Sequence, residues 1–150
     1  MRTHKAIDVA KWFLYRENKD IISDEFSSIS NLKLQKLLYY AQGTFLAIKG
    51  LPLFNESIIA WHHGPVVMEV YDIYKNHKGN PIPYNGDFDV NEFDNEEQNL
   101  LENVYETFGQ FSAWKLRDMT HGESPWLETE HMAIISNEKI KTYFEENYIE

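Results

Sequence analysis

Residues 31–49 carry the strongest structural signal in the chain, an apolar pattern with helical spacing and a stop signal at its end. The apolar positions recur at intervals of three and four residues, which is the period of a helix with one buried face: Leu34, Leu37, Leu38, Ala41, Phe45 and Ile48. Ser30 or Asn31 can cap the first free amides. Gly50 stands where a left-handed residue ends a helix, and Pro52 prevents its continuation. We therefore predict a long helix over residues 31–49.

Similar patterns predict further helices on both sides of this one. A first helix spans residues 6–18, and another follows Pro65, which favours a first helical position, until the break at residues 78–81. Asp94 and Glu97 resemble a capping box for a helix over residues 95–108. Ser112 caps a short helix through Met119, and Ser124 and Ser136 begin two more. In the last of these helices we expect an inward face made by Ile140, Tyr143 and Phe144.

Two segments predict β-structure. Residues 57–62 are β-branched and aromatic and lie between turn signals, so we expect a short strand there. Asn85-Gly86 favours a tight hairpin turn, which predicts a small hairpin within residues 81–93. No internal repeat or long linker divides the sequence. The expected fold is mainly α, a single compact helical domain over residues 1–150 with a small β element.

Composition narrows the classes of function. The chain has no cysteine, which excludes disulfides, cysteine-based zinc sites and thiol catalysis. Its net charge of -10 disfavours general nucleic-acid binding and suits a basic protein partner, although acidity also serves solubility alone. No signal peptide and no apolar run long enough for a membrane span is visible, so we expect a cytoplasmic protein.

The sequence lacks the motifs of several common enzyme classes. The sequence contains no GxSxG, Walker or GxGxxG motif and no HExxH helix, so no cofactor and no metal site is expected. The remaining enzymatic alternative is a metal-dependent hydrolase that uses His121, Glu123 and His131, because catalytic zinc often takes two histidines and a carboxylate.

Three segments combine aromatic residues with turns and supply the candidate binding site. We expect His63, Gly64 and Pro65, with Trp61 beside them, to form one wall of a pocket at a helix start. His121, Glu123 and Trp126 form the other wall, and Lys36 and Tyr40 face it from the long helix. Free amides, Trp, Tyr and His at such a place suit recognition of a partner. The alternative is that Trp61 and Trp126 belong to the core and that Gly64 and Pro65 only turn the chain.

The same segments, in this order, resemble the Panacea domain. The resemblance begins with the amphipathic first helix, covers most of the chain, and includes no motif within residues 81–95. It rests on the following stretches: Leu32-Lys33-Leu34-Gln35-Lys36-Leu37-Leu38-Tyr39-Tyr40-Ala41-Gln42, Gly50-Leu51-Pro52-Leu53-Phe54, Ala60-Trp61-His62-His63-Gly64-Pro65-Val66, Val70-Tyr71, Leu116-Arg117-Asp118-Met119-Thr120-His121 and Glu123-Ser124-Pro125-Trp126.

The resemblance implies a non-enzymatic antitoxin of a bacterial or prophage toxin–antitoxin system. Domains of this family, which includes SocA-like and phage-associated GepA-like proteins, neutralise toxins that are usually encoded beside them. The implied partner is such a cognate toxin, bound directly. The alternative that the family offers is a proteolytic adaptor that delivers the toxin to a Clp-type protease. An exposed Tyr-rich surface also suits a homo-oligomer.

Overall fold

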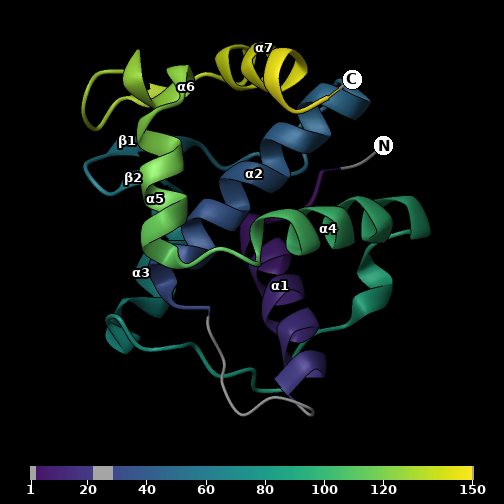
Figure 1. Cartoon of the computed structure of the whole chain (residues 1–150). Coiled ribbons are helices and arrows are strands. Elements are labelled where there is room, and N and C mark those ends of the chain that lie inside the picture. Colours follow the sequence, from purple (N-terminus) through teal and green to yellow (C-terminus); the bar gives the residue numbers. More distant parts are fainter. Residues whose placement is uncertain (1–2, 22–28, 150) are drawn as a thin grey trace.

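Helix α2 (Asn31–Lys49) runs through the middle of the structure, and most other elements pack around it (Figure 1). A computed structural model of the chain describes residues 3–21 and 29–149. Helices α1, α3, α4, α5 and α7 and strand β2 all contact α2. The elements are α1 (Ala6–Ile21), α2 (Asn31–Lys49), β1 (Ile58–Trp61), β2 (Gly64–Val66), α3 (Met68–Tyr74), α4 (Asn95–Phe108), α5 (Ala113–His121), α6 (Ser124–Leu127), β3 (Ile134–Ile135) and α7 (Asn137–Asn147), with 3-10 helices at Lys75–His77 and Val90–Glu92. The mainly helical single domain with a small β element is confirmed.

Both ends of α2 have the capping chemistry that the sequence predicts. The Ser30 side chain accepts a hydrogen bond from the Lys33 amide at the start of the helix. Gly50 adopts the left-handed conformation, with φ of 74°, and its amide donates to the Leu46 carbonyl. A residue with a side chain is strained at such a φ, so the helix ends where glycine permits the turn.

The burial of α2 extends around its whole circumference, which the single apolar stripe did not predict. Its buried residues include four long polar side chains, and each of these bonds to main-chain atoms of a neighbouring segment. Lys33 donates to the Gly109 carbonyl, and Lys36 donates to the Pro65 carbonyl. The Gln35 side chain accepts from the Val67 amide, and the Gln42 side chain bonds to the main chain of Leu53 and Phe54. A buried polar group without a partner is costly, so these bonds fix the segments that surround the helix. Ile48, assigned to the stripe, is 46% exposed instead.

The region after Trp61 is a β-hairpin, and the helix predicted to begin at Pro65 begins at Met68. Strand β2 pairs antiparallel with β1, and Gly64 lies opposite Trp61, so His62 and His63 form the turn. Strand β3 extends the sheet on the other side of β1, in the order β2-β1-β3. Proline suits both a helix start and a sheet edge. Pairing with β1 and the bond from Lys36 to the Pro65 carbonyl favour the strand here.

The hairpin predicted within residues 81–93 is not formed. The segment contains one isolated bridge, between Ser30 and Pro81, and the 3-10 helix Val90–Glu92. The chain does bend at Gly86, which has a φ of 82°, and the Asp87 amide donates to the Asn85 side chain. Aromatic contacts with α1, rather than β-pairing, hold the segment. The ring centroids of Tyr84 and Phe88 lie 5.9 and 5.5 Å from that of Tyr15.

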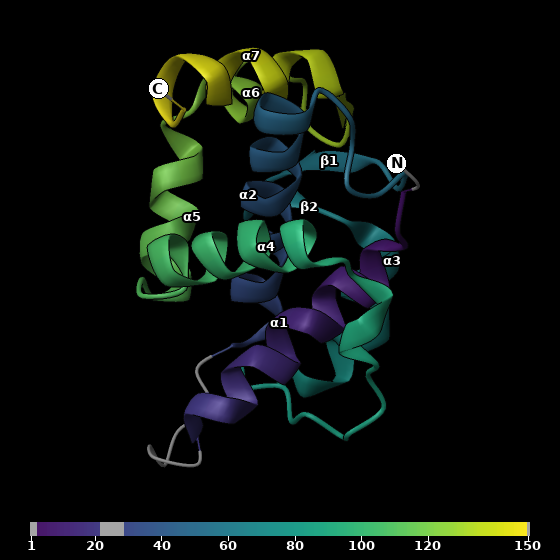
Figure 2. The ribbon, with the colours of Figure 1, turned by 90° about the vertical axis from the view of Figure 1, so that its right-hand side faces the viewer.

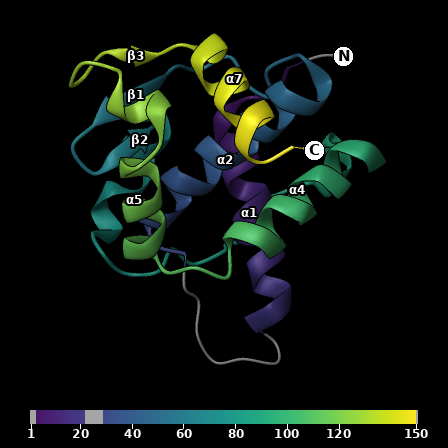
Figure 3. The ribbon, with the colours of Figure 1, turned by 45° about the horizontal axis from the view of Figure 1, so that its top comes forward.

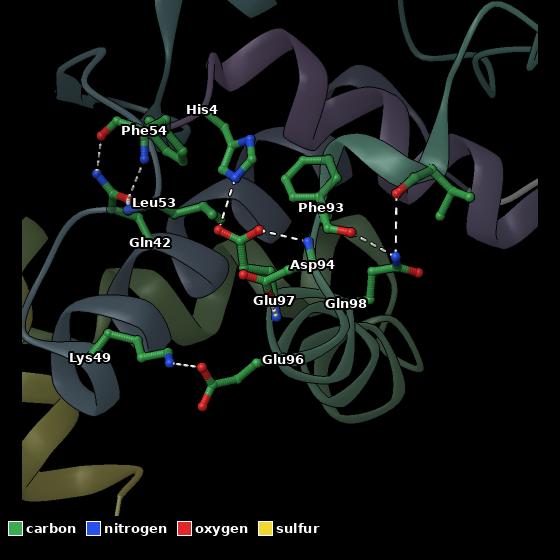
Figure 4. A network of polar contacts seen from close by, with 11 residues as sticks. His4, Gln42, Lys49, Leu53, Phe54, Phe93, Asp94, Glu96, Glu97 and Gln98 are labelled. Atoms are coloured by element: carbon green, nitrogen blue, oxygen red, sulfur yellow. Dashed lines mark hydrogen bonds and ion pairs between the residues drawn. The ribbon is translucent and has the colours of Figure 1, made fainter. Parts of the chain in front are cut away.

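A polar network joins the N-terminal segment to the start of α4 (Figure 4). His4 Nε2 lies 2.9 Å from a Glu97 carboxylate oxygen, and the His4 ring stacks on Phe93. Glu97 also closes the predicted capping box, because its side chain accepts from the Asp94 amide while Asp94 caps Glu97. Nearby, Gln42 binds the main chain of Leu53 and Phe54, as the same view shows. Because the His4 amide also donates to the Leu53 carbonyl, the network holds the segment around His4 against both α2 and α4.

Helix α7 lies across the C-terminal half of α2, as Figure 2 shows from the side. Ile140 and Phe144 are buried, and Tyr143 is half-buried, so the predicted inward face is confirmed. The closest approach is at Gly43, where a Cβ atom would overlap the Phe144 ring. None of the helices in the described residues is long and apolar enough to cross a membrane.

The contact between Gly43 and Phe144 gives a stability test. Gly43→Ala should lower the free energy of unfolding by about 1–3 kcal/mol, because the added methyl group overpacks the α2–α7 contact. Gly79→Ala is the matched control, since a Cβ there meets nothing within 4 Å. Urea unfolding of both variants measures the difference. Equal stability of Gly43→Ala and the wild type would contradict the close packing.

Candidate functional site

The β1–β2 turn and the α5–α6 junction lie side by side, so the two predicted pocket walls are adjacent (Figure 3). The Trp126 indole Nε1 donates to the Trp61 carbonyl over 2.7 Å. The His121 ring stacks on Trp126, with ring centroids 4.1 Å apart and 15° between the planes. We call this surface the turn–junction face. Its partly or fully exposed residues are Trp61, His62, His63, Trp114, Arg117, His121, Trp126, Leu127 and His131.

A buried carboxylate lies beneath this face. Glu123 is 3% exposed, and its oxygens accept hydrogen bonds from three tyrosine hydroxyls. Tyr39 and Tyr40 of α2 donate over 2.8 and 2.9 Å, and Tyr148, just after α7, donates over 2.5 Å. One carboxylate therefore joins the α5–α6 junction to the central helix and to the end of the chain. Hydroxyl bonds to a buried carboxylate are among the stronger hydrogen bonds in proteins.

The protonation of this cluster is set mainly by burial. Loss of solvent raises the pKa of Glu123 above its usual value, and the three hydroxyl bonds oppose the rise. Burial and the adjacent Glu123 carboxylate also raise the pKa values of Tyr39 and Tyr40, so both remain neutral donors. The cluster thus holds the Glu123 carboxyl group and three tyrosine hydroxyls in fixed positions.

Lys36 is the other buried ionisable group below the face. Its Nζ donates to the Pro65 carbonyl over 2.9 Å, and its side chain is 0% exposed. Burial, with a further contribution from Arg117, lowers the pKa of Lys36 to about 7. Gly64 makes room for this side chain, because a Cβ there would lie 2.8 Å from both Lys36 Cε and Thr120 Oγ1. The φ of Gly64, 102°, also disfavours a side chain.

Three ring and guanidinium nitrogens beside Lys36 have no hydrogen-bond partner among residues 3–21 and 29–149. They are His63 Nδ1, Arg117 Nε and His121 Nε2, and each is shielded from solvent. Burial lowers the pKa values of His63 and His121, and the positive charge of Arg117 lowers both further. An unsatisfied buried polar group costs about 1–3 kcal/mol, so such groups are often functional.

Two shallow grooves flank the His62-His63 turn. The first has a volume of about 320 Å³ and is lined by Ala60, His62, Trp126, Leu127, Thr129 and His131. The second has a volume of about 210 Å³ and is lined by Asn31, Leu32, Trp61, His63, Tyr71, Lys78 and Trp114. The side chains of Trp114 and Leu127 are 62% and 57% exposed. Exposed aromatic and apolar groups beside grooves are typical of surfaces that bind proteins.

The predicted site residues divide into two layers. Five of them are buried and form the floor of the turn–junction face: Lys36, Tyr40, Gly64, Pro65 and Glu123. The remaining four are half-buried and belong to its surface: Trp61, His63, His121 and Trp126. Trp126 also packs against the core, as the alternative interpretation of the tryptophans expects.

Several residues of the site escaped the sequence prediction. Trp114 and Arg117 stand three positions apart on α5, with the Arg117 guanidinium 5.1 Å from the Trp114 ring centroid. That spacing places them on one helical face, a signal available in the sequence. Tyr39 and Tyr148 were also missed. Nothing in the local sequence around Tyr148 indicates its bond to Glu123.

The metal-hydrolase alternative is not supported by the geometry. Glu123 is directed onto the tyrosines, while His121 stacks on Trp126 and His131 is exposed. Within residues 3–21 and 29–149, no three His, Asp or Glu side chains are grouped as a metal ion requires. The alternative set of His121, Glu123 and His131 is therefore not brought together as metal ligands in the structure.

Comparison with known proteins finds a family model and a relative, each of which matches part of the chain. The family model described as "Antitoxin SocA-like, Panacea domain" matches residues 34–127. A stretch of 43 residues is 60% identical to Antitoxin SocA of Caulobacter vibrioides (strain NA1000 / CB15N). That stretch covers 29% of this chain and 23% of the relative. No solved structure matches the chain.

The buried carboxylate predicts a pH dependence of stability. The pKa of Glu123 is raised in the folded chain, so at pH values above 4.5 the folded chain binds more protons than the unfolded chain. The contribution of Glu123 to stability therefore falls as the pH rises from 4.5 through its raised pKa. The difference in free energy of unfolding between the wild type and Glu123→Gln should therefore fall over that range. Urea unfolding at several pH values measures it, with the exposed Glu130→Gln as control. A difference that does not change with pH would contradict the raised pKa.

The lowered pKa of Lys36 predicts that stability changes with pH in the opposite direction. Its pKa is lowered to about 7 from 10.5, so the unfolded chain binds more protons between these values and stability gains as the pH rises. The stability of the wild type relative to Lys36→Met should increase steadily above pH 7, as measured by chemical unfolding. The exposed Lys115→Met is the control. A constant difference would mean that Lys36 stays charged in the folded chain.

Proposed function

Because the chain belongs to the SocA-like antitoxin family with the Panacea domain, we propose that it is an antitoxin that neutralises a cognate toxin by direct binding. In this proposal it acts in the cytoplasm on a toxin encoded by a neighbouring gene. The observation that carries the proposal is the position of the family match. Residues 34–127 contain all but one of the residues of the turn–junction face, the exception being His131.

The chemistry of the turn–junction face supports binding of a protein. It combines the exposed side chains of Trp114 and Leu127 with Arg117 and two adjacent grooves. Tryptophan and arginine are enriched among the residues that contribute most to binding energy in protein interfaces. Within the part of the chain that the structure describes, Trp114 and Leu127 remain uncovered.

The buried floor supports a preformed binding surface. The bonds from Tyr39, Tyr40 and Tyr148 to Glu123 fix the α5–α6 junction against α2. Lys36 donates to the Pro65 carbonyl and Gln35 accepts from the Val67 amide, and these two bonds fix the end of the hairpin. A surface that is already ordered loses less conformational entropy on binding, which favours affinity.

Substitutions on the face test the proposal. Trp114→Ala and Leu127→Ser should each weaken binding of the toxin by about tenfold or more, since they remove exposed apolar anchors without altering the core. Leu51→Ser is the matched control, because Leu51 is 46% exposed just after the C-terminal end of α2. Growth of cells that express the neighbouring gene with each variant measures neutralisation, and calorimetry with the purified toxin measures affinity.

The outcomes separate the modes of action. Loss of rescue in both face variants, with full rescue by Leu51→Ser, is the expected result. Full rescue by both face variants would place the interface elsewhere, and a neighbouring gene that is not toxic would contradict the antitoxin proposal. Rescue that disappears in a host without Clp-type proteases would replace direct inhibition by proteolytic delivery.

A further inference from the structure

Four nitrogen-bearing side chains gather under and beside the second groove in a chain whose net charge is -10. They are Lys36, His63, Arg117 and His121, and the charge of Arg117 acts on each of the other three. Among the described residues, the carboxylate within ion-pair distance of this group is that of Asp118, 3.7 Å from Arg117 Nη1. Asp118 is 71% exposed there, so it neutralises the group only weakly.

The hydrogen-bonding capacity of this group is largely unused. His63 Nδ1, Arg117 Nε and His121 Nε2 are shielded from solvent and have no hydrogen-bond partner in the part of the chain that the structure describes. The Arg117 Nε–H is always a donor, because the guanidinium stays protonated in proteins. This permanent donor, with two imidazole rings beside it and little negative charge nearby, forms an environment that favours an anion.

An apolar groove adjoins these donors. His63 lines it together with Trp61, Tyr71, Lys78 and Trp114, and the Arg117 guanidinium lies over the Trp114 ring at 5.1 Å. One side of His63 therefore faces the groove residues, while its ring also experiences the charges of Arg117 and Lys36. A ligand seated here meets aromatic rings and cationic groups at the same time.

We propose that this groove binds an acidic segment of the toxin, in which an aspartate or glutamate stands next to an apolar side chain. The carboxylate binds Arg117 and His63, with Lys78 at the rim, and the apolar side chain lies against Trp61, Tyr71 and Trp114. This inference rests on the proposed function, because it names the chemistry by which the same face recognises its partner. In this inference the groove offers positive charge to its ligand, whereas the chain as a whole is negatively charged.

The groove favours a carboxylate carried by a protein over a free anion. A free phosphate or carboxylate uses the nitrogens alone and leaves the three aromatic walls without contact. The net charge of -10 on the chain also repels small anions from solution. An acidic residue within a protein interface is instead brought to the groove by the contacts around it, and burial between the two surfaces strengthens its bonds.

The test compares variants of equal charge on one helix. Arg117→Gln should weaken binding of the purified toxin by about 30-fold or more, because it leaves the partner's carboxylate without its charged donor. Lys115→Gln is the matched control, since this exposed lysine of α5 lies two residues away and its loss changes the net charge equally. Melting temperatures of both variants check the fold. Arg117→Glu should be rescued by exchange of one acidic residue of the toxin for lysine.

Each outcome decides between the inference and the proposed function. Failure of the wild type to bind or neutralise the toxin would overturn both. Normal binding by the wild type and by Arg117→Gln would overturn only the acidic-segment inference and leave the antitoxin function standing. Titration with inorganic phosphate, followed by NMR of the His63 and His121 rings, tests the other source of an anion. Saturation at submillimolar phosphate, with toxin binding unaffected by Arg117→Gln, would make this a small-anion site instead.

Discussion

The burial of α2 on all sides is the constraint on which the rest of the structure depends. A helix that is enclosed in this way must find a partner for every polar group that it carries. Lys33, Lys36, Gln35 and Gln42 meet this demand by bonding to the main chain of the segments around them. Those segments are loops and strand ends that a small hydrophobic core alone would position poorly. The polar residues of α2 therefore determine the path of the chain as well as the stability of the helix.

The same constraint produces the surface that we assign to partner binding. Tyr39 and Tyr40 direct their hydroxyls from α2 to Glu123, and Lys36 holds the Pro65 carbonyl, so both walls of the turn–junction face stand on one helix. Buried residues of the site thus contribute through the positions of their neighbours, and exposed ones such as Trp114 and Leu127 remain for direct contact.

Local chemistry made much of the fold predictable, and long-range contacts account for what was not. The Ser30 cap, the Gly50 stop and the Asp94–Glu97 box act within a few residues, so the sequence indicates them directly. Pro65 is compatible with a helix start and a strand, and only pairing with β1 decides between them. Aromatic contacts with α1 hold residues 81–93, and the bond of Tyr148 to Glu123 joins positions 25 residues apart. The adjacency of the two site walls was predicted, but the sequence alone does not show it, and it rests on contacts such as the bond from Trp126 to the Trp61 carbonyl. The burial of the lower layer was not predicted, because it depends on how α2 is enclosed.

Hydrogen–deuterium exchange of the chain with and without its purified toxin tests most directly whether the turn–junction face is the binding surface. Binding there should slow exchange in the β1–β2 turn around His62, in α5 and in the α6–β3 segment. Exchange in α1 should remain unchanged, since α1 lies away from α5 and the β1–β2 hairpin (Figure 1). The same holds for the loop around Gly86, because Tyr84 and Phe88 pack it against Tyr15 of α1. Protection confined to α1, α4 or that loop, with the turn and α5 unaffected, would contradict the assignment of the face.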